Sequence, residues 1–439
     1  MTNISISREK PPSHSGFRRN EMWTYFGPAF VASVAYIDPG NFATNILGGS
    51  QFGYRLLWVL LWSNAMAILI QYLSAKLGIV TGLTLPQNCR RHFSRPTTIL
   101  LWLAAEVAAI ATDLAEFLGA ALGLYLLFGP GLLAHGWSRT ETLFAAALVS
   151  AVLVFLILAL DLAGYQWLEW GIMTFVGIIG ICYGIEVFLV HPDWRLAAFY
   201  TLVPTLDPKD FHGSLYAAVG MLGATVMPHV VYLHSALVQP RRKELVKQPI
   251  ADGSSRRRKY LRFELIDVFV AMNGAWLINS AMIVMAAAAF VHSGGAPSIE
   301  DAYHTLGPLL GPLSATVFAV ALLCSGLSSS TVGVMAGQVI IEGFLDIKFS
   351  IFLRRLITIV PALVVIAIGL DPLKILILSQ VVLSFALPFA LIPLLILTSR
   401  VSVMKSFASA RRTRVAGWCS VGIILTLNIV LLGQIALGL

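Results

Sequence analysis

The chain has 439 residues, of which 57% are hydrophobic and only 12% charged. This composition excludes an ordinary soluble domain and is typical of a helical protein that crosses the bilayer many times, so we expect the lipid bilayer as a partner. The formal net charge of +8 would suit nucleic-acid binding, but the basic residues lie between apolar segments, where membrane topology places them. We therefore expect no nucleic-acid partner. The four cysteines form no CxxC pair and predict ordinary buried residues.

Residues 1–20 are polar and are expected to form a disordered cytoplasmic tail. The first apolar run is long and lacks a small-residue cleavage site, so we expect no cleavable signal peptide. Residues 21–439 then predict a single all-α transmembrane domain with about eleven spans. The predicted spans cover residues 22–47 (broken), 55–79, 97–128, 141–160, 171–191, 212–238 (broken), 264–292, 302–345, 352–370, 373–398 and 415–437. The long 302–345 stretch contains Pro308 and Pro312, which predict a turn or a re-entrant piece at its start.

The distribution of basic residues tests this span count. With eleven spans, 24 of the 30 Lys and Arg residues fall on the side of the N-terminus, and Arg354 and Arg355 are among them. By the positive-inside rule, the N-terminus is cytoplasmic and the C-terminus lies outside. The basic linker at 240–262 has two interpretations. It is a patch for nucleic acid or anionic lipid, or, as we favour, a cytoplasmic determinant of topology.

The first apolar segment is interrupted by Asp38-Pro39-Gly40-Asn41. A carboxylate in the middle of a membrane segment costs roughly 2.5–3.5 kcal/mol on insertion scales, so it is seldom retained without a role. Pro39 has no N–H, so the carbonyl of Ala35 loses its helical partner, and Asp38 is disfavoured in helical geometry. The sequence therefore predicts a broken helix that exposes a carboxylate, an amide oxygen and a free carbonyl, all of them possible metal ligands.

The same construction occurs at Met227-Pro228-His229, where Pro228 frees the carbonyl of Ala224. Two interrupted segments in corresponding halves of a chain indicate a substrate site at the membrane midplane. They also predict two inverted five-helix repeats, at about 22–191 and 212–398, with an extra helix at about 415–437. Here the second break adds a thioether, a soft ligand that favours transition metals over calcium and magnesium.

These motifs resemble those of the Nramp family of proton-coupled divalent-metal transporters, of the bacterial manganese transport type. The resemblance covers almost the whole chain and implies a LeuT-like fold with helices 1 and 6 unwound. It also implies a symporter, not an enzyme, that imports Mn²⁺ or Fe²⁺ with protons across the bacterial cytoplasmic membrane by alternating access. We expect it to function as a monomer without a permanent cofactor. The matching motifs are Asp38-Pro39-Gly40-Asn41-Phe42-Ala43-Thr44-Asn45, Ala111-Thr112-Asp113-Leu114-Ala115-Glu116-Phe117, Met227-Pro228-His229, Tyr232-Leu233-His234-Ser235 and Ser379-Gln380-Val381.

The resemblance also implies a set of metal ligands. Asp38 and Asn41 have a structural alternative, because either side chain could simply cap a half-helix. Met227 taken alone would be core filler, and its place before a proline is what favours a ligand role. A methionine here argues against the magnesium-transporting branch of the family. The implied ligands are Asp38, Asn41, Met227, the carbonyls of Ala35 and Ala224, and Gln380 in some conformations.

Asp113 and Glu116 are three residues apart and so lie on one face of the third span, where they predict a proton relay. Glu106 lies near the same face and could be a second step. Arg354 and Arg355 resemble arginines of the family at this position and are plausible partners of these carboxylates. Structural salt bridges are the alternative interpretation of the whole cluster.

Two histidines on the sixth span complete the candidates. His229 could bind the metal or belong to the proton route, and the resemblance favours the proton route. His234, near the cytoplasmic end, could tune the exit path or only contribute to packing. Both are of a residue type that titrates near neutral pH.

Three other function classes compete with this hypothesis. An amino-acid or sodium-coupled transporter could share the scaffold, but it would not need Met227 before a proline, and a binding assay with manganese against amino acids separates the two. An intramembrane metalloenzyme would need an HExxH run or a histidine cluster, and the sequence has neither. A metal-sensing receptor would be expected to carry a large soluble signalling domain.

Overall fold

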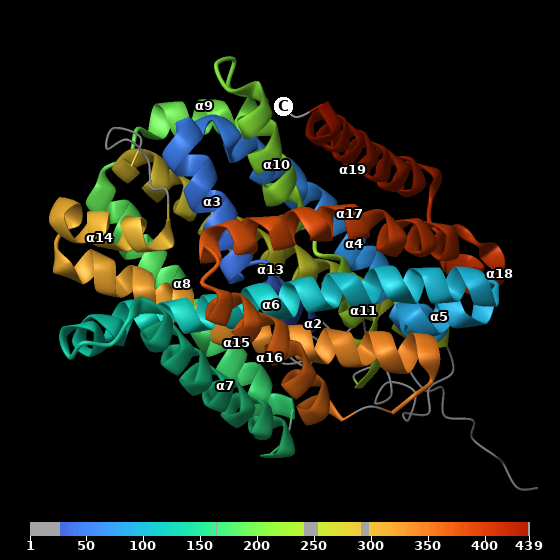
Figure 1. Ribbon diagram of the computed structural model, residues 1–439. Coiled ribbons are helices and arrows are strands. Elements are labelled where there is room, and N and C mark those ends of the chain that lie inside the picture. The colour runs from blue at the N-terminus through green and yellow to red at the C-terminus, as the bar shows by residue number, and fades with distance from the viewer. Residues whose placement is uncertain (1–26, 164, 241–252, 291–297, 349, 438–439) are drawn as a thin grey trace, which may run out of the picture.

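The computed structural model describes residues 27–163, 165–240, 253–290, 298–348 and 350–437, in which all regular structure is helical (Figure 1). The tail expected at 1–20 lies outside the described residues. The first half contains α2 (Pro28–Ala35), α3 (Pro39–Phe52), η1 (Gly53–Leu56), α4 (Leu57–Thr81), α5 (Leu85–His92), α6 (Arg95–Ala134), α7 (Arg139–Ala163), α8 (Tyr165–Val190) and α9 (Trp194–Leu202). The second half contains α10 (Phe211–Thr225), α11 (Pro228–Leu237), α13 (Gly253–Phe290), α14 (Ile299–Leu310), α15 (Pro312–Leu345), α16 (Ile351–Ile368), α17 (Pro372–Ser399), α18 (Val401–Met404), η3 (Lys405–Phe407) and α19 (Arg411–Leu437).

Nine helical runs in the described residues are long and apolar enough to cross a membrane. One of them, Pro39–Thr81, joins α3 to α4 through η1. When α3 and α4 are counted separately and the 18-residue apolar helix α16 is added, the predicted eleven spans are accounted for. The breaks between α2 and α3 and between α10 and α11 confirm the two predicted interruptions, in spans one and six.

Helices α6 and α15 run side by side through the middle of the molecule (Figure 1). Glycines allow their backbones to approach closely: a Cβ atom at Gly123 would lie 2.6 Å from the backbone nitrogen of Leu323. A Cβ at Gly326 would likewise overlap the backbone of Ala120. Small residues at a helix crossing are the usual means of tight packing in a membrane, where lipid offers no hydrophobic driving force between helices.

The long stretch at 302–345 divides as the prolines predicted. Helix α14 ends at Leu310, Gly311 follows with a φ of 96°, and Pro312 begins α15. A positive φ favours glycine, and proline is well suited to the first turn of the next helix. The short helix α14 therefore precedes the span and is separated from it by a turn.

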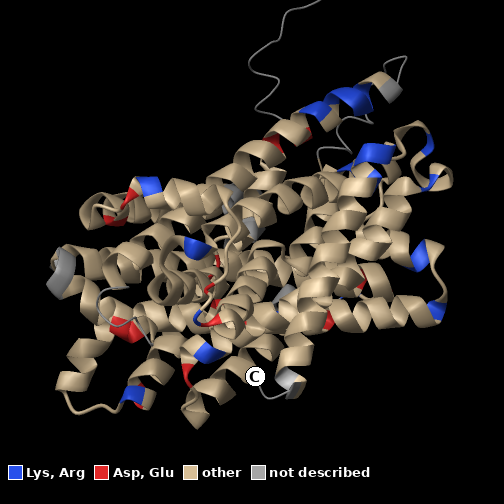
Figure 2. Cartoon of the chain, turned by 90° about the horizontal axis from the view of Figure 1, so that it is seen from above, with Lys and Arg blue, Asp and Glu red and all other residues tan. Residues whose placement is uncertain are grey.

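Two expectations need correction. Residues 253–262, expected in the basic linker, form the first turns of α13, while 241–252 lie outside the described residues. The charge count also needs correction, because Arg354 and Arg355, within the span expected at 352–370, are buried in α16 with only 3% and 0% of their surface exposed and are not topology charges at the membrane surface. They belong to the buried core, because carboxylates of α6 face them there. The remaining basic residues still gather mainly at one end of the bundle, at the right of Figure 2.

Candidate metal-binding site

The first helix break forms as the sequence chemistry requires. At the end of α2, the N–H of Tyr36 bonds the carbonyls of Ser33 and Val34, and Pro39 has no N–H to offer to Ala35. Asp38 has extended backbone geometry and serves as the N-cap of α3, where its Oδ1 accepts the N–H of Asn41 at 2.8 Å. This bond satisfies one of the free N–H groups at the start of α3. The carboxylate is thereby fixed at the end of a half-helix.

The second break also precedes a proline, but its cap is different. The N–H of Val226 bonds the carbonyl of Leu222, and Pro228 leaves Ala224 without its helical donor. Met227 occupies the N-cap position of α11, and its side chain makes no capping hydrogen bond. The thioether therefore does not stabilise the start of α11 in the way that a polar N-cap side chain would. It is free to bind a ligand.

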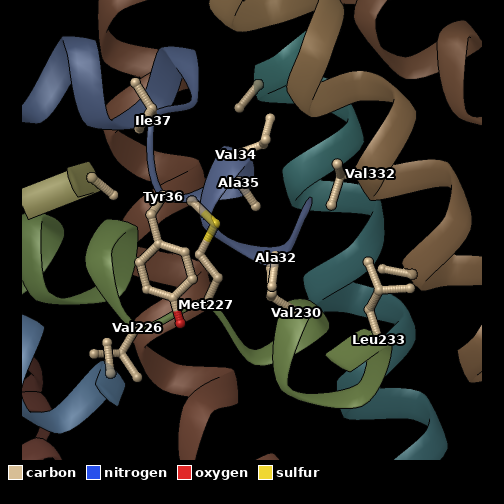
Figure 3. Close-up of a cluster of buried hydrophobic side chains, with 14 of the residues drawn as sticks. Ala32, Val34, Ala35, Tyr36, Ile37, Val226, Met227, Val230, Leu233 and Val332 are labelled. Atoms are coloured by element: carbon tan, nitrogen blue, oxygen red, sulfur yellow. The ribbon is translucent and has the colours of Figure 1, made fainter. Parts of the chain in front are cut away.

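Asn41 joins the two breaks. Its Nδ2 donates to Oδ1 of Asp38 at 2.7 Å and to the freed carbonyl of Ala224 at 3.0 Å. Figure 3 shows the sulfur of Met227 beside Tyr36, at the interrupted chain between Ala35 and Ile37. Residues 183 positions apart in the sequence thus meet at one buried point.

Gln380 of α17 adds a third element to this point. Its Nε2 donates to Oδ2 of Asp38 at 3.3 Å. Two glycines make room for this approach: a Cβ at Gly40 would overlap the side-chain amide of Gln380, and a Cβ at Gly223 would overlap its backbone oxygen. The two breaks alone do not predict this need for glycine at positions 40 and 223, because it comes from α17, a helix outside both breaks.

All six predicted ligand residues are fully buried, each with 0% of its surface exposed, and hydrogen bonds join four of them: Asp38, Asn41, Gln380 and the carbonyl of Ala224. Asp38 supplies the one formal charge of the six. The amide oxygens of Asn41 and Gln380 accept no hydrogen bond from the described residues, although buried amide oxygens are normally paired. The arrangement therefore offers oxygen donors, one negative charge and a thioether, a set that suits a borderline or soft divalent cation.

The carboxylates of α6 face the arginines of α16. Nη1 of Arg354 donates to Oε1 of Glu106 at 2.9 Å, and Nη1 of Arg355 lies 3.8 Å from Oδ1 of Asp113. Arg355 also donates to the hydroxyl of Ser330 at 3.1 Å. Each arginine thus faces a different carboxylate, so two charged groups of α6 lie against two of α16.

Asp113 and Glu116 converge on a single glycine of α15. A Cβ at Gly333 would lie 2.9 Å from Oδ1 of Asp113 and would overlap the carboxylate of Glu116. One turn further, a Cβ at Gly337 would overlap the guanidinium of Arg354. The spacing of these glycines is the GxxxG pattern, a sequence signal that could have located this surface.

The same face of α6 reaches the first helix break. A Cβ at Gly119 would overlap the ring of Pro39, which follows Asp38 directly. Glu116 lies one turn before Gly119 on α6, so the carboxylate series begins next to the candidate metal site. From there the series leads through Asp113 to Glu106, toward the end of α6 that carries Arg95.

The two histidines occupy different surroundings. Nδ1 of His229 lies 3.1 Å from the hydroxyl of Thr112, the residue before Asp113, so this ring connects α11 to the carboxylate helix. Within the part of the chain that the structure describes, no hydrogen bond joins His229 to the six predicted ligands. His234 lies between Gln71 and Glu264, at 2.9 Å from an oxygen of each.

Sequence reasoning missed a buried polar network around Tyr36. Its hydroxyl accepts a hydrogen bond from Nε2 of Gln71 at 2.6 Å, and its carbonyl accepts one from Nδ2 of Asn279 at 2.6 Å. Gln71 continues to His234, and Asn279 accepts from Asn45 at 2.7 Å. Each residue alone has the pattern of an ordinary polar core residue, so only the packing of α3, α4, α11 and α13 reveals the network.

Two discontinuous helices that meet at a buried polar centre, within an eleven-span bundle, define a secondary transporter. The family model for natural resistance-associated macrophage protein-like (Nramp) proteins matches residues 29–434. The chain is 47% identical to a divalent metal cation transporter MntH of Caldanaerobacter subterraneus subsp. tengcongensis, over 98% of each chain. The chain belongs to the Nramp family and is a membrane transporter, not an enzyme.

Solved structures agree with this assignment. A crystal structure of the Eremococcus coleocola manganese transporter, in complex with an aromatic bis-isothiourea substituted compound, is similar with a TM-score of 0.82 and 33% identity. The similarity covers 98% of this chain and 90% of that one. MhsT, solved in complex with L-phenylalanine, is similar with a TM-score of 0.57 and 13% identity, and the similarity covers 92% of this chain and 98% of MhsT. At this identity the similarity shows the LeuT-like fold alone.

Proposed function

We propose that this protein imports divalent transition-metal ions, Mn²⁺ and Fe²⁺ among them, together with protons, by alternating access across the bacterial inner membrane. The observation that carries the proposal is the junction of Asp38, Asn41 and Ala224 across the two helix breaks. Relatives named as a divalent metal cation transporter and a manganese transporter support the choice of cargo. The metal ion is transported and is not a resident cofactor.

The cation would be held by the donors of both breaks and α17. Asp38 would compensate one of its two charges, and Met227 would favour transition metals over magnesium. Rotation of the Asn41 amide would turn Oδ1 toward the cation in place of the hydrogen bond to Ala224. The proposed ligands are Asp38, Asn41, Met227, Gln380 and the carbonyls of Ala35 and Ala224.

Transport requires that this centre open to each side in turn. In the closed arrangement the ligands expose no surface, so entry and release both need movement of the half-helices. The interrupted backbone at each break is the natural hinge, because neither proline has an N–H to donate to the half-helix before it. The cation can favour one state only through contacts that differ between the two states.

Proton coupling would use the carboxylates of α6. Asp38 alone cannot neutralise a dication, and Glu116 and Asp113 lie on the helix face that touches Pro39. A proton would pass from the site along Glu116 and Asp113 toward Glu106. Arg354 and Arg355 would hold Glu106 and Asp113 in place.

The histidines would have separate roles. His229, beside Thr112 and Asp113, would belong to the proton route. His234, bonded to Gln71 and Glu264, would hold α11 to α4 and α13 near the cytoplasmic exit.

The orientation follows from the charge distribution in Figure 2, where basic residues gather at one end of the bundle. By the positive-inside rule, this end and the N-terminus are cytoplasmic, and the C-terminus lies outside. We take residues 21–439 as one transporter domain, with repeats at about 22–191 and 212–398 and an extra helix at about 415–437, which functions as a monomer.

The proposal is tested in proteoliposomes that contain the purified protein and a pH indicator inside. Uptake of Mn²⁺ with acidification of the lumen, and no comparable uptake of Mg²⁺, is the expected result. Mn²⁺ uptake without any change in luminal pH would contradict the proposed proton coupling but not the proposed metal transport. Failure to transport Mn²⁺ or Fe²⁺ would overturn it.

A further inference from the structure

An apolar groove runs along the outside of the bundle between α6, α17 and α19, away from the metal site. It has a volume of about 450 Å³, and its walls are almost entirely hydrocarbon. Pro388 and Pro393 of α17 lie in the lining, where they interrupt the regular helix surface. The other lining residues include Phe93, Leu101, Phe389, Ile392, Ile396 and Leu432.

The polar groups inside the groove are already satisfied. Asn428 exchanges two hydrogen bonds with Ser384, at 2.8 and 2.9 Å, and the hydroxyl of Thr97 lies 2.8 Å from that of Ser94. A molecule in this groove therefore meets hydrophobic contact and no polar group that needs a partner. The groove lies between three membrane-spanning helices, α6, α17 and α19. The apolar molecules that surround these helices in a bilayer are lipids, so the matching ligand is a lipid acyl chain.

One end of the groove is strongly basic. The guanidinium of Arg400 lies over the ring of Phe93, 5.7 Å from its centroid, and Phe93 lines the groove. Arg95 is the first residue of α6, between Phe93 and Thr97 in the sequence. Arg95 and Arg400 are both exposed. We call Arg95 and Arg400 the basic pair.

The basic pair has no acidic counterpart. Residues 39–105 and 372–439 contain no Asp or Glu at all. In the described part of the chain, no carboxylate forms an ion pair with either arginine, whereas nearby Arg90 is paired with Asp346 at 3.0 Å. Because the basic pair has no acidic partner and adjoins an apolar groove, a ligand that is both anionic and hydrophobic would suit this surface.

We propose that this groove binds an anionic phospholipid, with an acyl chain between α6, α17 and α19 and the phosphate on the basic pair. A second apolar groove supplies an internal comparison. It is lined by Trp58, Trp62 and Leu427 among others, with a volume of about 150 Å³, and Arg55 in the turn before it is already paired with Asp207 at 2.6 Å. That groove would accept lipid without preference for charge.

Native mass spectrometry of the purified full-length protein tests the proposal. The protein is incubated with equal amounts of phosphatidylglycerol and phosphatidylcholine of the same acyl chains, and the retained lipids are counted. We expect phosphatidylglycerol to be retained about tenfold over phosphatidylcholine, from the attraction of two arginines near the bilayer surface. Equal retention of the two lipids would overturn the proposal.

Two variants locate the site. Arg95→Gln with Arg400→Gln should bring the two lipids close to parity, while Arg257→Gln with Arg258→Gln, on α13 outside the groove, should leave the preference unchanged. Ile392→Trp fills the groove and should lower the number of retained lipids of both kinds. A preference that survives loss of the basic pair, or an unchanged lipid count in Ile392→Trp, would overturn the assignment. The readout is lipid retention, so it does not depend on the proposed transport.

Discussion

The two helix breaks have the same cause, a proline, but different capping residues. In each, a proline leaves the carbonyl four residues earlier without a helical donor, at Ala35 and at Ala224. The first break is capped by a charged side chain, since Asp38 accepts the N–H of Asn41. The second is capped by Met227, which makes no such bond. A polar residue at position 227 would stabilise the helix end better, which supports the ligand role that we propose for the thioether.

The breaks also differ in their neighbours. Both contact Gln380 of α17 through a glycine, but at the first break Gln380 also donates a hydrogen bond to Asp38, and Pro39 contacts Gly119 of α6. The second reaches α6 through His229 and continues through His234 to α4 and α13. We infer that the first break controls charge and protons and the second controls selectivity. Substitutions at each break test this division.

Replacement of the charge at the first break should have the largest effect. Asp38→Asn retains a side chain that can cap α3 but removes the one negative charge of the site. Loss of one member of a buried charge pair costs about 3–5 kcal/mol, so Mn²⁺ affinity should fall about 100- to 1000-fold or more. Isothermal titration with Mn²⁺ and uptake in proteoliposomes measure this loss.

Asp193→Asn is the matched control, because Asp193 caps the surface helix α9 in the same way. Its Mn²⁺ affinity should equal that of the parent protein. If Asp38→Asn retained normal uptake, the first break would be only a structural cap.

Removal of the next carboxylate should separate proton from metal. Asp113→Asn cannot accept a proton, so proton movement per Mn²⁺ should fall by about tenfold or more while Mn²⁺ affinity changes little. Luminal pH and metal uptake are recorded together, with Asp371→Asn, the N-cap of α17, as control. An equal loss of both activities would instead assign Asp113 to a structural ion pair with Arg355.

The second break should govern the choice of cation. Met227→Ala removes the soft ligand, so the preference for Mn²⁺ over Mg²⁺ or Ca²⁺ should fall about tenfold, with a smaller effect on total uptake. Competition of Mg²⁺ and Ca²⁺ with Mn²⁺ uptake measures it. Met221→Ala makes the same deletion at an equally buried methionine of α10 and should leave selectivity unchanged. Selectivity that did not respond to Met227→Ala would remove the distinction between the two breaks.

The helix breaks could be predicted from sequence because their cause is local. A proline removes one N–H wherever it occurs, so Asp38-Pro39 and Met227-Pro228 define the breaks without tertiary information. The ends of the helices were harder to predict from the sequence. Residues 253–262 extend α13, and their many basic side chains gave no periodic pattern that distinguishes helix from linker.

The contacts between distant helices could not be predicted in the same way. The sequence indicated Arg354 and Arg355 as partners for carboxylates, but only the packing of α16 on α6 assigns Glu106 to one and places Asp113 near the other. The Tyr36 to Gln71 to His234 network is likewise a product of tertiary packing. Gly333 and Gly337 are the exception, since their GxxxG spacing was visible in the sequence.

The smallest expected effect concerns the contact between the first break and α17. A Cβ at Gly40 would overlap the side-chain amide of Gln380 and force it away from Asp38. Because a single hydrogen bond contributes about 1 kcal/mol, Gly40→Ala should lower Mn²⁺ affinity by about fivefold. In Gly220→Ala, the control, the new Cβ would lie 3.4 Å from Thr44, an ordinary contact, so affinity should be unchanged.

A double-mutant cycle completes this last test. In a Gln380→Ala background the amide is absent, so Gly40→Ala should have no further effect on Mn²⁺ affinity. Additive losses in the double variant would mean that Gly40 acts through the backbone of the break instead. In that case Gln380 would contribute to Mn²⁺ binding independently of Gly40. The position of Asp38 would then depend on the backbone of the first break and not on its hydrogen bond with Gln380.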